Sequence, residues 1–292
     1  MSSPGTGRTA PSDRAGKTRD RLAILCGGGK VPLAVAAAAA AAGRDFVALA
    51  LRGQAGPEVE RFPHEWLRIG EVGRLFKLLA KHGCGELVIT GHVRRPEVKN
   101  IRFDLGGMMN LPRILAMMIG GDNHLLTSMI AFLEERGGVR VVGPDEIAPG
   151  LILDRVTVGG RKPSRRDLED IALGRRVLAA LAPFDIGQGV VVDRGRVIAV
   201  EAAEGTDAML ERCAELRADR VSRPSGVLVK APKQGQETRI DLPTIGAGTV
   251  EAAAAARLAG IAAEAGATLV ADLGELAATA ARLRLFVTGF AG

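Results

Sequence analysis

Short apolar segments alternate with helical segments along the first half of the chain, and this alternation limits the fold more than any other feature. Residues 22–26 are apolar and of strand length, a glycine triplet follows at 27–29, and an alanine-rich helical stretch occupies 31–42. A second apolar strand is expected at 46–51. Strands that alternate with helices form parallel sheets covered by helices. The N-terminal half is therefore predicted to be Rossmann-like with a mainly parallel sheet.

The positions of the remaining patterns predict an α/β protein with two α/β domains. The stretch 144–163 contains the breakers Pro149-Gly150 and Gly159-Gly160, which are typical of a connector. We expect a disordered basic tail at 1–20, a Rossmann-like domain at 21–143, a linker at 144–163 and a C-terminal α/β domain at 164–292. The predicted strands are 22–26, 46–51, 67–69, 86–90, 139–142, 189–193, 196–201, 226–230, 268–271 and 285–288, with a hairpin turn at 194–195. The predicted helices are 31–42, 73–82, 106–136, 165–181, 206–217, 247–258 and one between the last two strands.

The net charge of +6 is unevenly distributed. Residues 1–21 carry five cationic and two acidic side chains, so half of the excess lies in the tail. The rest of the chain is too weakly cationic for a polyanion-binding face, although local basic pockets for phosphate stay open. Aromatic residues make up 3% of the chain and tyrosine is absent, which disfavours base stacking on aromatic side chains. We therefore expect no nucleic-acid partner.

Cysteine and histidine show no metal-binding spacing. Cys26, Cys84 and Cys213 are far apart and form no CxxC pair, which is typical of buried thiols in a reducing compartment. The four histidines form no HExxH motif. A bound metal would therefore need oxygen ligands, which a hard ion such as Mg²⁺ prefers. Because residues 1–20 lack an apolar signal segment and no run is long enough to cross a bilayer, a cytoplasmic location is expected.

Two loops in the N-terminal half follow predicted strands at the end where parallel sheets bind ligands. Gly27-Gly28-Gly29 joins a strand to a helix, so it is either a phosphate-binding turn or a tight turn without a ligand. It is not the complete dinucleotide fingerprint, and the strand at 46–51 is followed by no acidic residue for a ribose. His92 follows the strand at 86–90 and is either a contact to a base or phosphate or an ordinary loop residue.

Methionine is concentrated in one part of the chain, since five of the seven lie at 108–129. Such a tract either packs a core or lines an adaptable apolar groove, for example for acyl chains. Asp122 interrupts the tract after Gly120-Gly121 and is a candidate N-cap.

Polar residues gather at three places in the second half, 185–189, 204–207 and 230–243. In the first two places they can be turn and cap residues. The third, KAPKQGQETRIDLP, crowds cations and carboxylates just before a helix. Its cations could hold a diphosphate while a carboxylate binds a metal or orients water. The alternative is a solvated charged loop.

Six motifs together resemble one known family. They are GGGKVP at 27–32, GHVRRP at 91–96, GDNHLL at 121–126, FDIGQGVVV at 184–192, VEAAEGTDAML at 200–210 and KAPKQGQETRIDLPTIG at 230–246. From residue 22 to the C-terminus the chain is similar to the UDP-2,3-diacylglucosamine pyrophosphatases of the LpxI type, which act in the lipid A pathway.

The resemblance implies a homodimeric enzyme that holds its substrate between two domains. It implies hydrolysis of UDP-2,3-diacylglucosamine to UMP and 2,3-diacylglucosamine 1-phosphate (lipid X), with Mg²⁺ or Mn²⁺ and with water attacking the sugar-side phosphorus. The family's essential aspartate falls on Asp241, and Asp122 matches a second acidic position, so both are candidate metal ligands. His92 and Asn123 depart from the family, where Asn and a second Asp can stand. The implied substrate-binding residues are Gly28, Gly29, His92, Asp122, Gln188, Thr206, Asp207, Lys230, Glu237, Thr238 and Arg239.

A diacyl substrate further implies peripheral contact of a cytoplasmic enzyme with the cytoplasmic face of the inner membrane. The basic tail would add attraction to anionic lipid. Two other functions remain as alternatives: a non-catalytic carrier of lipid or sugar nucleotide, and a Rossmann-type oxidoreductase. The missing acidic residue after the second strand argues against the oxidoreductase.

Overall fold

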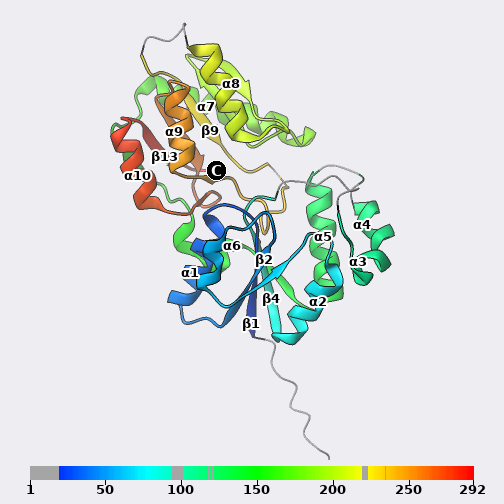
Figure 1. Ribbon diagram of the computed structural model, residues 1–292. Helices are drawn as coiled ribbons and strands as arrows, with labels where there is room; N and C mark the ends of the chain where they lie inside the picture. Colours follow the sequence, from blue (N-terminus) through cyan, green and yellow to red (C-terminus); the bar gives the residue numbers. More distant parts are fainter. Residues whose placement is uncertain (1–19, 94–100, 118, 120–121, 219–222, 234) are drawn as a thin grey trace, which may run out of the picture.

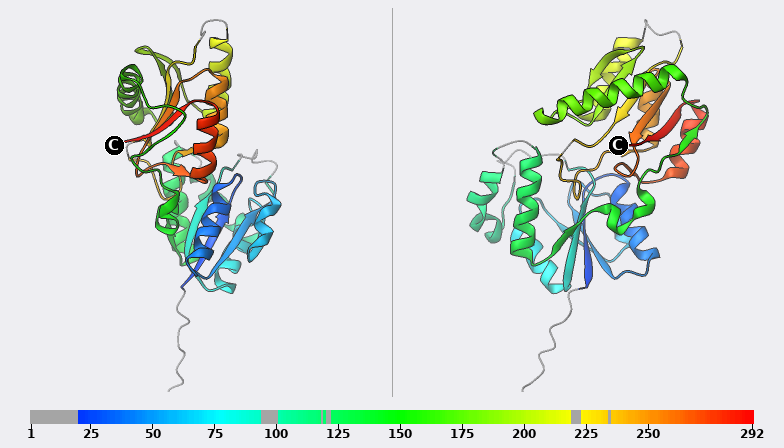
Figure 2. Two further views of the ribbon diagram at one scale, coloured as in Figure 1. Left: turned by 90° about the vertical axis from the view of Figure 1, so that its left-hand side faces the viewer. Right: turned by 180° about the vertical axis from the view of Figure 1, so that it is seen from behind.

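Two α/β lobes, each built on its own large sheet, are stacked in the computed structural model (Figures 1 and 2). The structure describes residues 20–93, 101–117, 119, 122–218, 223–233 and 235–292, so most of the expected tail lies outside the described part. The predicted α/β class with a mainly parallel N-terminal sheet is confirmed. Within the described part, no helix combines the length and the apolar character that crossing a membrane requires.

The N-terminal lobe follows the alternation of strand and helix that its sequence predicts. Its elements are β1 (Arg21–Cys26), α1 (Val31–Ala41), β2 (Phe46–Leu51), the 3₁₀ helix η1 (Pro57–Arg61), β3 (His64–Leu67), α2 (Val72–Lys81), β4 (Cys84–Thr90), α3 (Leu105–Met109), α4 (Leu111–Met117), α5 (Asp122–Gly137) and β5 (Arg140–Val142). The five strands are parallel in the order β3-β2-β1-β4-β5. Leu22 and Ile24 of β1 pack with α1 on one face, whereas Ala23 packs with α2 and α5 on the other.

Two predicted elements of this lobe differ from the structure. The strand expected at 67–69 lies earlier, because His64–Leu67 pairs with β2 from Ala48 onward. The helical stretch expected at 106–136 is divided into α3, α4 and α5. Asn110 ends α3 and donates from its side-chain amide to the Gly106 carbonyl at 2.7 Å, which offers the backbone an alternative to continuing the helix.

The C-terminal lobe has a mixed sheet. The elements from the connector onward are α6 (Pro144–Ile147), η3 (Pro149–Leu151), β6 (Thr157–Gly159), α7 (Arg165–Leu181), η4 (Ala182–Phe184), β7 (Gly189–Asp193), β8 (Arg196–Val200), α8 (Gly205–Arg217), β9 (Val227–Lys230), β10 (Thr244–Ile245), α9 (Ala247–Ala255), β11 (Gly260–Glu264), β12 (Leu269–Val270), α10 (Leu273–Arg282) and β13 (Phe286–Phe290). The strand order is β6-β13-β11-β9-β7-β8, with β13, β11 and β9 parallel and the remaining pairs antiparallel. Helices α8, α9 and α10 cover one face and α7 the other.

Sequence reasoning missed the central strand β11. Its sequence, Gly260–Glu264, directly follows an alanine-rich helix and carries the same small residues, so the helix was expected to reach 258. Small residues are needed there, because a Cβ at Gly260 would lie 2.5 Å from the Phe286 ring of the neighbouring strand. The strand expected at 268–271 forms β12, which pairs with β10 in a separate two-stranded sheet.

The stretch expected as a connector, 144–163, is structured at both ends. Ile147 of α6 packs in the same core as α1, and β6 pairs with β13 at the edge of the C-terminal sheet. The two lobes also meet through later segments. Leu269 is buried in the core beside α1, and Ile240 packs against the core beneath α2 and α5.

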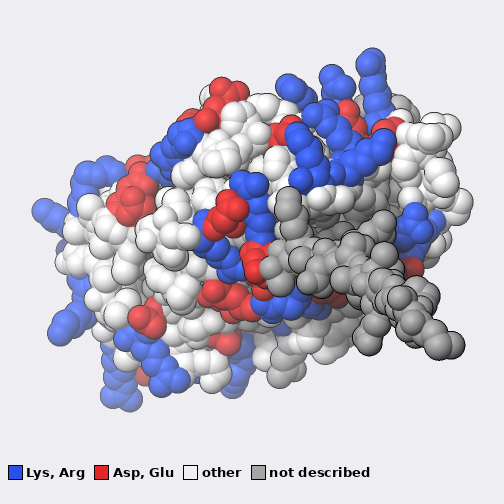
Figure 3. Space-filling view, turned by 90° about the horizontal axis from the view of Figure 1, so that it is seen from below, with Lys and Arg blue, Asp and Glu red and all other residues white. Residues whose placement is uncertain are grey.

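Charged side chains of both signs are mixed on the face of the N-terminal lobe seen from below (Figure 3). Several charges of this lobe are paired, for example Arg21 with Asp45 at 3.1 Å and Lys81 with Glu65 at 2.8 Å. The visible face therefore presents no uniform field of one sign.

Candidate active site

Two adjoining cavities lie where the lobes meet. The larger, about 900 Å³, is lined mainly by the C-terminal lobe, and the smaller, about 500 Å³, is lined by both lobes. His92, Asp207 and Asp241 line both cavities. The predicted site residues that line at least one of them are Gly28, Gly29, His92, Gln188, Thr206, Asp207, Lys230 and Asp241.

The glycine turn after β1 is packed tightly against the loop after β4. Gly27 N donates to Thr90 O at 2.8 Å, Gly28 N donates to His92 O at 2.8 Å, and His92 N donates to Gly28 O at 3.1 Å. A Cβ at Gly27 would lie 2.6 Å from the His92 carbonyl oxygen, and a Cβ at Gly28 would lie 2.6 Å from the His92 ring. Gly27 and Gly28 thus permit close packing because they lack side chains, and their N–H groups donate to the carbonyls of Thr90 and His92. Gly29, exposed with φ of +93°, lines the smaller cavity at the start of α1, where a helix favours an anion.

Asp241 is held by two side-chain amides. Gln188 Nε2 donates to Asp241 Oδ2 at 2.7 Å, and Gln236 Nε2 donates to the same oxygen and, at 2.7 Å, to the Asp241 carbonyl. Gln236 is oriented in turn by Lys233 N, which donates to Gln236 Oε1 at 2.8 Å. Sequence reasoning singled out Gln188 but not Gln236, whose only signal was its place in the KAPKQGQETRIDLP motif. The carboxylate is therefore fixed in the wall shared by both cavities.

Lys230 lies at the inner wall of the larger cavity. It ends β9 and is only 5% exposed, and its Nζ donates to Thr206 Oγ1 at 2.8 Å and to Thr244 O at 3.3 Å. Burial lowers the pKa of the Lys230 ammonium, and the nearby carboxylates of Glu201, Asp207 and Asp241 act in the opposite direction. A bound anion would add to the compensating charge that these carboxylates supply to the buried cation.

Glu201 orients the threonine that Lys230 contacts. Thr206 Oγ1 donates to Glu201 Oε1 at 3.0 Å. Glu201 Oε2 is buried and has no hydrogen-bond partner within the described part of the chain. Gly189 makes room for this oxygen, because a Cβ there would lie 2.6 Å from it. Sequence reasoning did not single out Glu201, although it stands in the VEAAEGTDAML motif.

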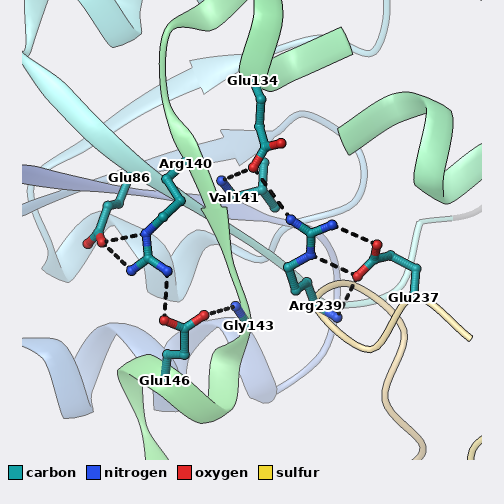
Figure 4. Close-up of polar contacts among 8 residues, drawn as sticks. All are labelled: Glu86, Glu134, Arg140, Val141, Gly143, Glu146, Glu237 and Arg239. Atoms are coloured by element: carbon teal, nitrogen blue, oxygen red, sulfur yellow. Dashed lines mark hydrogen bonds and ion pairs between the residues drawn. The ribbon is translucent and has the colours of Figure 1, made fainter. Parts of the chain in front are cut away.

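The predicted residues Glu237 and Arg239 bind each other and do not line the two cavities. Arg239 donates from Nε and Nη2 to the Glu237 carboxylate at 2.9 and 2.8 Å, and its Nη1 lies 3.5 Å from Glu134 of α5 (Figure 4). Hydrogen bonding by Arg239 lowers the pKa of Glu237. Thr238 is exposed between them. Asp122 begins α5, but its side chain lies outside the described part.

A third cavity, about 570 Å³, lies beside these two and is lined mostly by apolar side chains of the N-terminal lobe. Leu125, Leu126 and Met129 of α5 contribute to it, and Asp241 stands in its wall. The other described methionines of the predicted tract have different surroundings: Met117 is buried, whereas Met108 and Met109 are exposed. The tract is therefore divided between the core, this cavity and the surface.

The donors at the site suit a metal ion that is shared with a ligand. Among the described residues, no group of three or more His, Cys, Asp or Glu side chains is placed to hold a metal ion alone. Mg²⁺ commonly uses one or two carboxylates together with substrate phosphates and water. Asp241 and the oxygens of a bound diphosphate would fit such an ion.

Comparisons with known proteins cover almost the whole described chain. Residues 21–151 match the LpxI N-terminal domain and residues 154–288 match the LpxI C-terminal domain. The chain is 41% identical over 272 residues to a protein of Caulobacter vibrioides named UDP-2,3-diacylglucosamine pyrophosphatase LpxI, which covers 92% of this chain and 97% of that protein. The resemblance expected from the six motifs is confirmed: the chain belongs to the LpxI family.

Proposed function

We propose that this chain hydrolyses the pyrophosphate bond of UDP-2,3-diacylglucosamine in lipid A biosynthesis, giving UMP and 2,3-diacylglucosamine 1-phosphate. The name of the Caulobacter relative supports this substrate. The observation that carries the proposal is the position of Asp241, which lines three cavities with different chemistry. The larger of the two adjoining cavities is lined by the buried cation Lys230, and the smaller is lined by the glycine turn. The third cavity is mostly apolar. A diphosphate that joins a nucleoside to a diacylated sugar requires all three surroundings.

The proposed mechanism places the diphosphate between Lys230 and Asp241. The Lys230 ammonium offsets the charge of the phosphate oxygens, and Asp241 orients a water molecule and accepts its proton. The water oxygen forms a bond to the sugar-side phosphorus. The bond from that phosphorus to the bridging oxygen breaks, and UMP leaves with the bridging oxygen.

We propose Mg²⁺ or Mn²⁺ as the cofactor, held by Asp241 and the diphosphate, with Asp122 as a second candidate ligand. Such an ion would neutralise charge on the phosphoryl oxygens. Chelation with EDTA should abolish turnover, and added Mg²⁺ should restore it. Full turnover after exhaustive chelation would exclude the metal.

The apolar cavity is proposed to hold acyl chain. Its wall of Leu125, Leu126 and Met129 joins the position of the reacting phosphates through Asp241. Burial of methylene groups in such a cavity contributes roughly 0.8 kcal/mol each, which is enough to favour a lipid over a free sugar nucleotide.

Incubation of the purified protein with UDP-2,3-diacylglucosamine in detergent tests the function. UMP and the 1-phosphate should appear in equal amounts, and in ¹⁸O-labelled water the label should enter the 1-phosphate. Label in UMP would contradict attack on the sugar-side phosphorus. Tight binding of substrate without turnover would instead indicate a carrier, and binding of a nicotinamide or flavin cofactor without UMP binding would indicate an oxidoreductase.

We also propose a homodimer that contacts the inner membrane peripherally from the cytoplasm. Leu105, Met108 and Met109 of α3 are largely exposed, which suits a lipid surface. The protein should float with anionic vesicles at low salt, and light scattering should give twice the mass of one chain.

Removal of residues 1–20 should leave turnover in detergent nearly unchanged, since this tail is not proposed to contribute to the site.

A further inference from the structure

The segment that carries Asp241 belongs to the C-terminal lobe but is attached to a helix of the N-terminal lobe. The side chain of Asn123, in the first turn of α5, makes two hydrogen bonds to the backbone of this segment. Asn123 Nδ2 donates to Gly235 O at 3.0 Å, and Glu237 N donates to Asn123 Oδ1 at 2.9 Å. Both functional atoms of one amide are therefore used to hold residues 235–237 in place.

Two further contacts hold the same segment against the N-terminal lobe. Ile240 packs against the apolar core beneath α2 and α5. The Arg239 guanidinium lies 3.5 Å from Glu134, which is itself fixed by Val141 N at 3.0 Å (Figure 4). The Arg239 and Glu134 side chains are 39% and 36% exposed, so this long ion pair contributes little. The Asn123 amide, with hydrogen bonds of 3.0 and 2.9 Å, provides the shorter polar contacts between α5 and the segment among the described residues.

Contacts inside the segment transmit this attachment to the Asp241 carboxylate. Asp241 N donates to Glu237 O at 3.1 Å, so the residue that Asn123 binds also fixes the Asp241 backbone. Gln236 lies between the two anchored residues, Gly235 and Glu237, and its amide binds both the Asp241 carbonyl and its carboxylate. A displacement of 235–237 would therefore move two of the groups that orient Asp241, the Glu237 carbonyl and the Gln236 amide, whereas Gln188 lies outside the segment.

We propose that Asn123 is a positioning residue for the reaction: it fixes Asp241 from the other lobe through the backbone of 235–237, without contacting substrate. This inference rests on the proposed role of Asp241. Misplacement of a reacting group by about 1 Å can cost about 10²-fold in rate, whereas binding surfaces elsewhere in the cavities are left intact. Loss of the Asn123 amide should therefore lower kcat and leave KM nearly unchanged.

The test compares Asn123→Ala, Asn123→Asp and the control Thr127→Ala. Asn123→Ala removes both hydrogen bonds, whereas Asn123→Asp keeps the acceptor for Glu237 N and places a carboxylate oxygen, which cannot donate, against Gly235 O. Thr127 lies one turn along α5 and donates to the Asn123 backbone carbonyl at 2.9 Å, so its truncation perturbs the helix without removing the link. We expect kcat to fall by about 10- to 100-fold in Asn123→Ala and by less in Asn123→Asp, with KM within about threefold.

Hydrogen exchange of the amides at 235–241, measured without substrate, gives a readout that does not depend on the activity. Exchange there should be faster in Asn123→Ala than in the wild type and Thr127→Ala. A second control, Arg140→Gln, disrupts the neighbouring pairs with Glu86 and Glu146, which lie within the N-terminal part of the chain, and should leave this exchange unchanged (Figure 4).

Unchanged exchange in Asn123→Ala would overturn the inference, and so would an increase in KM with normal kcat, because the latter indicates substrate contact. If the wild type lacks turnover, the proposed function fails, and faster exchange in Asn123→Ala would still establish the link between the lobes.

Discussion

Gln188 donates a hydrogen bond of 2.7 Å from its side-chain amide to Oδ2 of Asp241, a residue 53 positions later in the chain. Gln188 is itself fixed at the start of β7, because its carbonyl accepts from Ala231 N at 3.1 Å just after β9. Gln236 donates to the same carboxylate oxygen from within the loop that carries Asp241. Two amides from separate segments thus determine how one carboxylate is presented to the cavities.

The Asp241→Asn substitution should lower turnover by roughly 10²–10⁴, the range for losing a positioned acid or base. It keeps the size of the side chain but removes its charge and basicity. UMP binding should survive, because Lys230 and the glycine turn remain and a negative charge has been removed. Steady-state kinetics and calorimetric titration with UMP measure the two effects. Asp154→Asn serves as the control, because Asp154 lines a different cavity from the three that Asp241 lines. Turnover within a few-fold of wild type would make Asp241 a structural residue.

Gln188→Ala and Gln236→Ala should each lower kcat by about tenfold, because the carboxylate loses one of its two orienting donors. KM should change little, since both amides donate to Asp241 in the structure, although the family resemblance implied substrate contact for Gln188. The double variant should lose less than the product of the two effects, because both amides bind the same oxygen. The kinetic constants of all three variants measure this coupling. A rise in KM with unchanged kcat would place these amides in the substrate site.

Much of the architecture could be predicted because it depends on local patterns. The hairpin turn at Arg194-Gly195 is an example, since both residues adopt positive φ, 55° and 73°, as a two-residue turn of type I′ requires. The strand β11 could not be predicted in the same way. Its Gly and Ala residues have low strand propensity, and the Phe286 ring packed over Gly260, which explains the glycine, is a contact between strands far apart in the sequence.

The site was predictable as a set of motifs but not as a geometry. Gly28 and Lys230 are about two hundred residues apart, and nothing in their spacing places them around adjoining cavities. The contacts between the lobes could not be predicted from the sequence either. The charges of Glu237 and Arg239 suggested ligand binding, whereas the structure pairs them with each other and brings Arg239 near Glu134 of the other lobe.

Gly27→Ala should destabilise the fold by about 1–3 kcal/mol, the usual cost of overpacking. The new Cβ would lie 2.6 Å from the His92 carbonyl oxygen and 2.8 Å from that of Gly91, so backbone rather than a flexible side chain must move. Urea unfolding measures the change in the free energy of unfolding. The control is Gly150→Ala, because a Cβ at Gly150 meets nothing within 4 Å. Equal stability of the two variants would contradict the close packing of the glycine turn.

Met129→Trp should fill part of the apolar cavity and change the preference for acyl-chain length. The larger ring leaves less room beside Leu125 and Leu126, so substrates with long chains should lose more kcat/KM than substrates with short chains. Competition between two substrates of different chain length measures the ratio directly. Leu168→Trp, on the exposed surface of α7 and away from the three cavities, should leave the ratio unchanged. An unchanged ratio in Met129→Trp would place the acyl chains elsewhere.

UMP binding should weaken at high pH as Lys230 loses its proton. Burial places the pKa of Lys230 below the ordinary lysine value of 10.5, so the loss should begin at lower pH than for an exposed lysine. The same shift has a consequence for stability. Between the two pKa values the unfolded chain binds more protons than the folded one, so the Lys230 contribution to stability rises with pH in that window.

Lys230→Met tests this assignment. It removes a charge-assisted contact worth about 1.5–3 kcal/mol, so UMP affinity at neutral pH should fall by roughly 10- to 100-fold. Its remaining affinity should lose the alkaline decline that Lys230 causes. Calorimetric titration with UMP from neutral to alkaline pH measures both effects, with Lys162→Met as the control for an exposed lysine. If Lys230→Met binds UMP as tightly as the wild type and with the same decline, Lys230 does not hold the phosphate.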